Sequence, residues 1–115
     1  MSNSLHFAAP GASQAADLSQ AAAAVAAGQV SAGALLQENL AAADGTACHH
    51  AYLRRFDAQA GVAAQAVDTA CAAGMPVPPL AGLAVSVKDL FDVAGWPTTA
   101  GARSLADAPP AVADC

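Results

Sequence analysis

Large aromatic side chains are scarce in this chain of 115 residues, where they make up 4% of the total. The hydrophobic fraction is 56%, but alanine supplies much of it. Hydrophobic stabilisation follows the apolar area removed from water, at about 25 cal/mol per Å². An alanine-rich chain with few large side chains therefore predicts a small core, and it indicates part of a larger folding unit.

Basic residues are also few, and the formal net charge is -5. The four of them are scattered along the chain: Arg54, Arg55, Lys88 and Arg103. They form no stripe that could follow a phosphate backbone, so we expect no nucleic-acid contact by this segment. The chain also lacks a basic amphipathic stretch of the kind that binds a membrane surface.

Neither the cysteines nor the apolar runs indicate a secreted or membrane protein. Cys48, Cys71 and Cys115 are odd in number and irregular in spacing, which argues against a disulfide framework. The alanine-rich run 21–27 is too short to span a bilayer. Residues 1–18 lack the basic start and the continuous apolar centre of a secretory signal. These absences favour a cytoplasmic protein.

Three helices are predicted after a flexible N-terminal arm, residues 1–16. They cover 18–27, 32–44 and 58–73, and their ends carry the residue types that favour helix termini. The expected N-caps are Asp17, Ser31 and Asp57, and the expected stops are Gly28, Gly45 and Gly74.

Helical spacing predicts which faces of two of these helices are buried. In the second helix the apolar face is Leu36, Leu40 and Ala43. In the third it is a stripe of small residues with one valine beside it: Val62, Ala66, Ala70 and Ala73, with Val67. The segment 51–56 is expected to be a short strand or otherwise extended.

The run 83–87 (LAVSV) is apolar and rich in β-branched residues, which predicts a buried strand ending at Lys88. A lysine at the end of a buried strand is costly unless it is paired or functional. On spacing alone, a surface lysine or a pair with Asp89 or Asp92 is the stronger interpretation. The alternative is a general base, because burial disfavours the charged form of an amine.

Four short segments in fixed order then change the balance between these two interpretations of Lys88. They are 79–83 (PLAGL), 85–89 (VSVKD), 92–95 (DVAG) and 98–101 (TTAG). Together they resemble the lysine-bearing segment of the amidase signature family. The likeness covers about residues 18–107 and is strong over 79–101. Trp96 departs from the family's usual aliphatic or small residue.

The resemblance implies an α/β fold. This chain would supply the N-terminal helices and the first strand or strands of a mixed sheet flanked by helices. Residues 17–115 would form the N-terminal part of a single domain, truncated before the family's Gly/Ser-rich signature. It also implies amide C–N bond hydrolysis by a Ser–cis-Ser–Lys triad, in which Lys88 is the lysine. The two serines are not recognised here, since Ser86 and Ser104 lack a Gly/Ser-rich context. We therefore expect the chain by itself to be inactive.

Other candidate residues carry weaker signals. Cys48, His49 and His50 lack the usual spacing of zinc ligands, so neither a metal nor a cofactor is expected. Asp89 and Asp92 are better explained by turn and capping roles than by acid–base chemistry. Thr98, Thr99 and Gly101 are expected to shape the loop beside the lysine, and contact with substrate stays open.

Two alternatives to a simple amidase remain. The first is the amidase subunit of a glutamyl-tRNA amidotransferase, which releases ammonia from glutamine. The second is a non-catalytic helical interaction module that retains a degenerate lysine segment. The expected ligand is a small amide, no membrane is expected as a partner, and a homodimer of the complete protein stays open.

Overall fold

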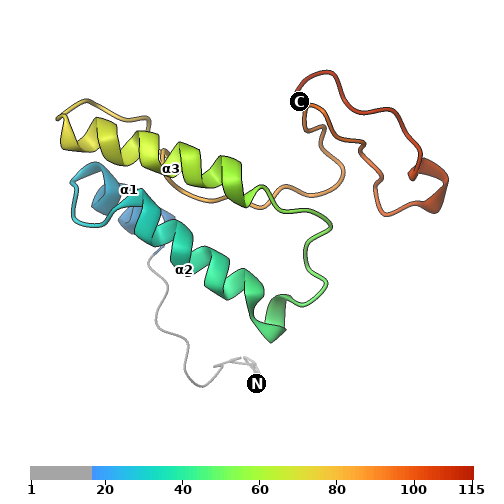
Figure 1. Ribbon diagram of the computed structural model, residues 1–115, viewed down its shortest axis with the longest axis horizontal. Helices are drawn as coiled ribbons and strands as arrows, with labels where there is room; N and C mark the ends of the chain where they lie inside the picture. The colour runs from blue at the N-terminus through green and yellow to red at the C-terminus, as the bar shows by residue number, and fades with distance from the viewer. Residues whose placement is uncertain (1–16) are drawn as a thin grey trace, which may run out of the picture. The chain divides into compact units, whose positions relative to one another are not determined.

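The computed structural model describes residues 17–115, which contain three α-helices and two short 3-10 helices (Figure 1). The α-helices are α1 (Leu18–Ala26), α2 (Ala32–Asp44) and α3 (Asp57–Ala72). The 3-10 helices are η1 (Thr46–Cys48) and η2 (Arg103–Leu105). The predicted helices are thus confirmed to within a residue at each end. The expected flexible arm, residues 1–16, lies outside the described residues.

The chain divides into two compact units, the first running to Ala84 and the second being Val85–Cys115. All three α-helices belong to the first unit, where α2 and α3 pack against each other. None of the helices in the described part of the chain is long and apolar enough to cross a membrane.

Two of the three predicted N-caps are confirmed by hydrogen bonds. The Asp17 carboxylate accepts from the N–H of Gln20 at 2.8 Å. The Ser31 hydroxyl oxygen accepts from the N–H of Ala34 at 3.0 Å. Each bond satisfies one of the N–H groups that the first turn of a helix leaves without a partner.

The third predicted cap is wrong. Asp57 is the first residue of α3, so the N-cap position belongs to Phe56. No side-chain hydrogen bond caps this helix. The carboxylate of Asp57 instead accepts from the guanidinium of Arg55 at 3.1 and 2.7 Å. A charged donor with a forked geometry two residues away outcompetes a backbone N–H for this carboxylate. Asp57 still places a negative charge at the positive end of the helix dipole.

The core of the first unit is small, as the composition predicts. Its buried members are Val25, Ala32, Leu36 and Ala64. Partly buried apolar side chains surround them: Val30, Leu35, Leu40, Ala60 and Val67. Two of the four buried residues are alanines, so little apolar area is withdrawn from water. The predicted face of α2 is confirmed, because Leu36 is buried and both Leu40 and Ala43 are half-buried.

The predicted face of α3 is wrong in most of its members: Val67 packs against the core and Ala70 is half-buried, but Val62, Ala66 and Ala73 are exposed. Val62 is 70% exposed, whereas Ala64 is buried and Ala60 and Val67 pack against the core. These three residues lie at i, i+4 and i+7 and so form one helical stripe. Because alanines occur on every side of α3, periodicity did not single out this face. The contact with α2 selected it.

The predicted strand over 83–87 is absent. This segment has no regular secondary structure, and Val85 and Val87 are 77% and 57% exposed. Within residues 17–115 the single β-type pairing is an isolated parallel bridge between Ala94 and Ala111. A strand needs a neighbour to accept its N–H and C=O groups, and the described residues supply none beside 83–87. The expected mixed sheet is therefore not formed here, and the described fold is helical.

Candidate functional site

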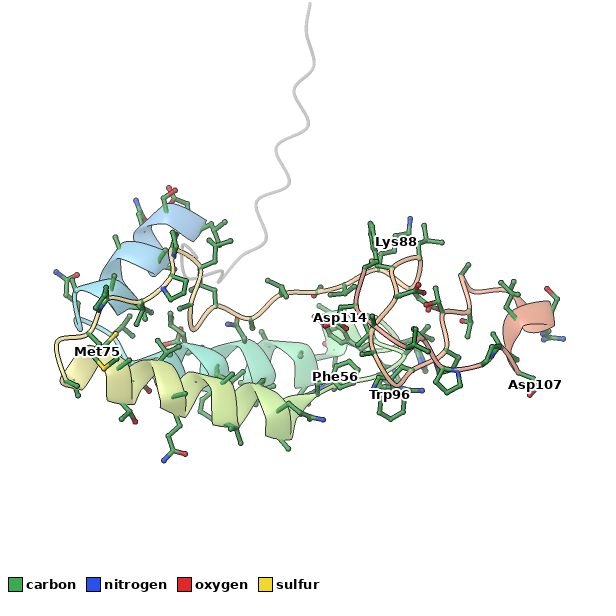
Figure 2. The ribbon with its side chains drawn as sticks, turned by 90° about the horizontal axis from the view of Figure 1, so that it is seen from above. Phe56, Met75, Lys88, Trp96, Asp107 and Asp114 are labelled. Carbon is green, nitrogen blue, oxygen red and sulfur yellow. The ribbon has the colours of Figure 1, made fainter. Side chains whose placement is uncertain are left out.

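Lys88 begins a tight turn at the end of the apolar segment 83–87. Its carbonyl oxygen accepts from the N–H groups of Leu90 at 2.7 Å and Phe91 at 3.1 Å. The residue is exposed, and its side chain projects outward from the second unit (Figure 2). The turn fixes the backbone of Lys88 while leaving the amine accessible.

Asp89, the next residue, binds the loop that follows ten residues later. Its carboxylate accepts from the backbone N–H of Thr99 at 3.0 Å and from the Thr99 hydroxyl. These two bonds, the hydroxyl first, hold the pKa of Asp89 below its ordinary value, and the backbone N–H groups of Gly101 and Ala100 act in the same direction. The carboxylate is thus committed as an anion to its own loop.

Further bonds close the rest of the second unit. The hydroxyl of Thr98 donates to the carboxylate of Asp92 at 2.6 Å. The N–H of Ala94 donates to the carboxylate of Asp114 at 2.7 Å. Beside this bond, the N–H of Gly95 donates to the carbonyl of Ala111 at 2.8 Å. The turn roles expected for Asp89 and Asp92 are confirmed, since both carboxylates accept from loop threonines.

The amine of Lys88 forms no ion pair in the described residues. The two carboxylates nearest in sequence, Asp89 and Asp92, are occupied by Thr99 and Thr98. Of the two simple explanations of Lys88, a pair with a neighbouring carboxylate is therefore wrong, whereas a surface lysine agrees with the exposure of this residue in the described chain. No hydrogen bond between residues 17 and 115 joins the amine to a serine, so its proton-transfer partner is not shown.

The Cys48–His50 segment lines an open hollow of about 400 Å³ together with Asp44, Tyr52 and Arg55. The rings of His49 and His50 lie against each other, with centroids 4.0 Å apart and planes inclined by 32°. No group of three metal-ligand side chains gathers in the part of the chain that the structure describes.

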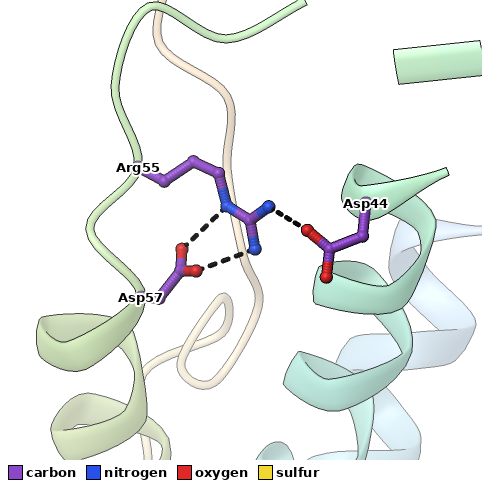
Figure 3. A network of polar contacts seen from close by, with 3 residues as sticks. All are labelled: Asp44, Arg55 and Asp57. Carbon is purple, nitrogen blue, oxygen red and sulfur yellow. Dashed lines mark hydrogen bonds and ion pairs between the residues drawn. The ribbon is translucent and has the colours of Figure 1, made fainter. Parts of the chain in front are cut away.

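A polar network beside this hollow was not predicted from the sequence. The guanidinium of Arg55 binds Asp44 at the end of α2 and Asp57 at the start of α3 (Figure 3). The hydrogen bonds that Arg55 donates to both carboxylates, that of Asp57 first, raise the pKa of Arg55 above its ordinary value. The Arg-x-Asp spacing of 55 and 57 is a local signal for half of this network. The contact with Asp44 depends on the packing of the helices.

Comparison with known proteins connects this chain to one family. The family model described as Amidase matches residues 34–115, which include Lys88 and the whole Asp89–Thr99 loop. A subunit of the glutamyl-tRNA(Gln) amidotransferase of Salinispora arenicola (strain CNS-205) is 53% identical over 57 residues, 50% of this chain and 12% of that protein. AtzE, which is a subunit of the 1-carboxybiuret hydrolase of Pseudomonas sp. (strain ADP), is 41% identical over 93 residues, 78% of this chain and 20% of that protein.

A solved structure is also similar to this chain. It is described as a vestigial protein complex that reveals the evolutionary origins of an s-triazine catabolic enzyme, and it superposes with a TM-score of 0.76 at 36% identity. The match covers 84% of this chain and 21% of that chain. The chain thus spans a fifth or less of the curated relatives named here. The extent of the family match shows that this chain belongs to the amidase signature family.

Proposed function

We propose that the complete protein hydrolyses an amide C–N bond and that Lys88 is its catalytic base. The observation that carries the proposal is the state of Lys88. It is the only lysine of the chain, its amine has no ion pair in the described residues, and it lies inside the part that matches the amidase family. A lysine whose amine has no ion-pair partner is available for proton transfer.

The chemistry follows from what an amine can accept. In the family's triad, a lysine takes the proton of a bridging serine, which in turn takes the proton of the nucleophilic serine. The nucleophile then attacks the amide carbon, and the proton passes on to the departing nitrogen. An ammonium has no lone pair to accept a proton, so this role requires the neutral amine of Lys88.

The exposed apolar segment 83–87 supports the same proposal. Val85 and Val87 are more than half exposed in the described chain, and a sheet in the complete protein would cover them. That covering would also withdraw water from the end of the segment, where Lys88 lies. Removing water from an amine disfavours its charged form, which is the change that a lysine base needs.

A second candidate function is supported by the named relatives. The Salinispora protein belongs to an amidotransferase, and the Pseudomonas protein belongs to a hydrolase. Both names describe one subunit of an enzyme, and the solved relative is a protein complex. We propose a protein partner for the complete enzyme in either case. Ammonia release from glutamine that depends on a partner would favour the amidotransferase, whereas release from simple amides without glutamine would favour the hydrolase.

The test compares acylation rates of the full-length enzyme carrying Lys88→Ala, Lys88→Arg or, as a charge control, Arg103→Gln. Loss of a general base costs about 100- to 10,000-fold. We expect that loss for both lysine variants, since guanidinium stays protonated, and a nearly unchanged rate for Arg103→Gln. Circular dichroism checks that all three variants are folded. Near-wild-type acylation by Lys88→Arg would disprove the base role and leave Lys88 as a fixed positive charge.

A further inference from the structure

The residue after Lys88 makes the main side-chain attachment of the loop that follows it. Asp89 accepts from both donors of Thr99, the N–H at 3.0 Å and the hydroxyl. Lys88 and Asp89 share a peptide unit, and the carbonyl of that unit is itself held by the N–H groups of Leu90 and Phe91. Hydrogen bonds therefore hold the backbone at Lys88 in two ways, through its own carbonyl and through the side chain of the next residue, Asp89.

The loop at the other end of this attachment is shaped around a negative charge. Ala100 has φ 51° and Gly101 has φ 70°, so two consecutive residues adopt the left-handed conformation. Successive backbone N–H groups in such a turn form a concave anion site. In this chain the carboxylate of Asp89 accepts from the N–H of Thr99, the residue directly before these two.

These contacts close the loop 89–99 of the second unit, and Lys88 lies directly before it. Asp89 forms no ion pair there, and Thr99 belongs to no helix. The position of a reacting group matters in catalysis, since a displacement of about 1 Å can cost about 100-fold in rate. A lysine on a long flexible side chain depends on a fixed backbone to reach one partner reproducibly.

We infer that Asp89 and Thr99 are positioning residues, whose hydrogen bonds hold the backbone of Lys88 where its amine can serve as base. The inference rests on the proposed function of Lys88. It assigns Asp89 no proton transfer of its own, because its carboxylate is already committed to the N–H and hydroxyl of Thr99.

The experiment uses the full-length enzyme and measures kcat and KM for amide hydrolysis, per active site titrated with an acylating inhibitor. Thr99→Val keeps the branched shape but removes the hydroxyl, whereas Thr99→Ser keeps the hydroxyl. Asp89→Asn removes the charge. Asp114→Asn is the matched control, because Asp114 also accepts a backbone N–H within the second unit. Lys88→Ala is measured in parallel.

We expect Thr99→Val and Asp89→Asn to lower kcat by about 10- to 100-fold, with KM nearly unchanged. Thr99→Ser and Asp114→Asn should stay near wild type. Equal losses in Thr99→Val and Thr99→Ser, or a wild-type kcat in Thr99→Val, would overturn the positioning role. If Thr99→Val kept the wild-type kcat while Lys88→Ala was inactive, the positioning role would be wrong and the base role of Lys88 would still hold. Undiminished acylation by Lys88→Ala would overturn both proposals.

Discussion

The carboxylate of Asp68 in α3 accepts a hydrogen bond from the N–H of Ala32, the first residue of α2, at 2.6 Å. The other carboxylate oxygen accepts from the N–H of Gly33 at 3.0 Å. With the hydroxyl of Ser31 on the N–H of Ala34, the first three N–H groups of α2 are satisfied by side chains. A residue 36 positions along the chain thus caps α2 and fixes how α3 packs on it.

Removing this cap should destabilise the first unit. Asp68→Ala leaves two part-buried N–H groups without a partner, and loss of a cap typically costs about 0.5–2 kcal/mol. We expect the upper end of that range, and less from Asp17→Ala, which removes one exposed bond. Urea unfolding of the 115-residue chain, followed by circular dichroism at 222 nm, measures both. A cost for Asp68→Ala no larger than that for Asp17→Ala would show that the long-range cap contributes nothing.

Gly82 should be far less tolerant of a side chain than Gly28. Both have positive φ, 79° and 66°, so an alanine at either costs about 1–2 kcal/mol. A Cβ at Gly82 would also lie 2.6 Å from the Cβ of Ala32, whereas nothing lies within 4 Å at Gly28. Overpacking adds about 1–3 kcal/mol. We therefore predict a larger loss of unfolding free energy for Gly82→Ala, measured by urea unfolding. Equal losses would mean that residues 80–84 do not pack on the helices in solution.

Acidification should release the loop that Asp89 holds. Because the pKa of Asp89 is lowered in the folded chain, its bonds contribute stability that is fully present above the unfolded value, about 3.9. That contribution is lost as the pH falls through the folded value. We predict an NMR titration midpoint for the Asp89 carboxyl below about 3.9 in the 115-residue chain. Thr99→Val should move the midpoint upward, because it removes the largest cause of the shift, while Asp114→Asn should leave it in place. An ordinary midpoint in the unsubstituted chain would contradict the attachment.

The 115-residue chain by itself should release no ammonia from amides. A lysine can move a proton, but acyl transfer also needs a nucleophile and donors for the oxyanion. The purified chain and its Lys88→Ala variant should therefore both give the background rate with simple aliphatic or aromatic amides. Ammonia release above the Lys88→Ala control would mean that a nucleophile exists within these residues.

The site was predictable from sequence in part, because its signal is local. The order of the four segments between 79 and 101 identified the family that the comparison with known proteins shows. The turn roles of Asp89 and Asp92 also followed from residue type. The partners Thr99 and Thr98 lie ten and six residues further on, and only the folded loop brought them to the carboxylates.

Helix limits were determined by the sequence itself, since caps and stops act within one turn of the chain. Asp17, Ser31 and Gly28 each specify a local backbone conformation that needs no distant partner. Tertiary structure decided the rest. It chose the buried face of α3, because alanines on all sides offered no preference, and it placed Asp68 on α2. It also left 83–87 unpaired, because an apolar run becomes a strand only where another strand lies beside it to share its backbone hydrogen bonds.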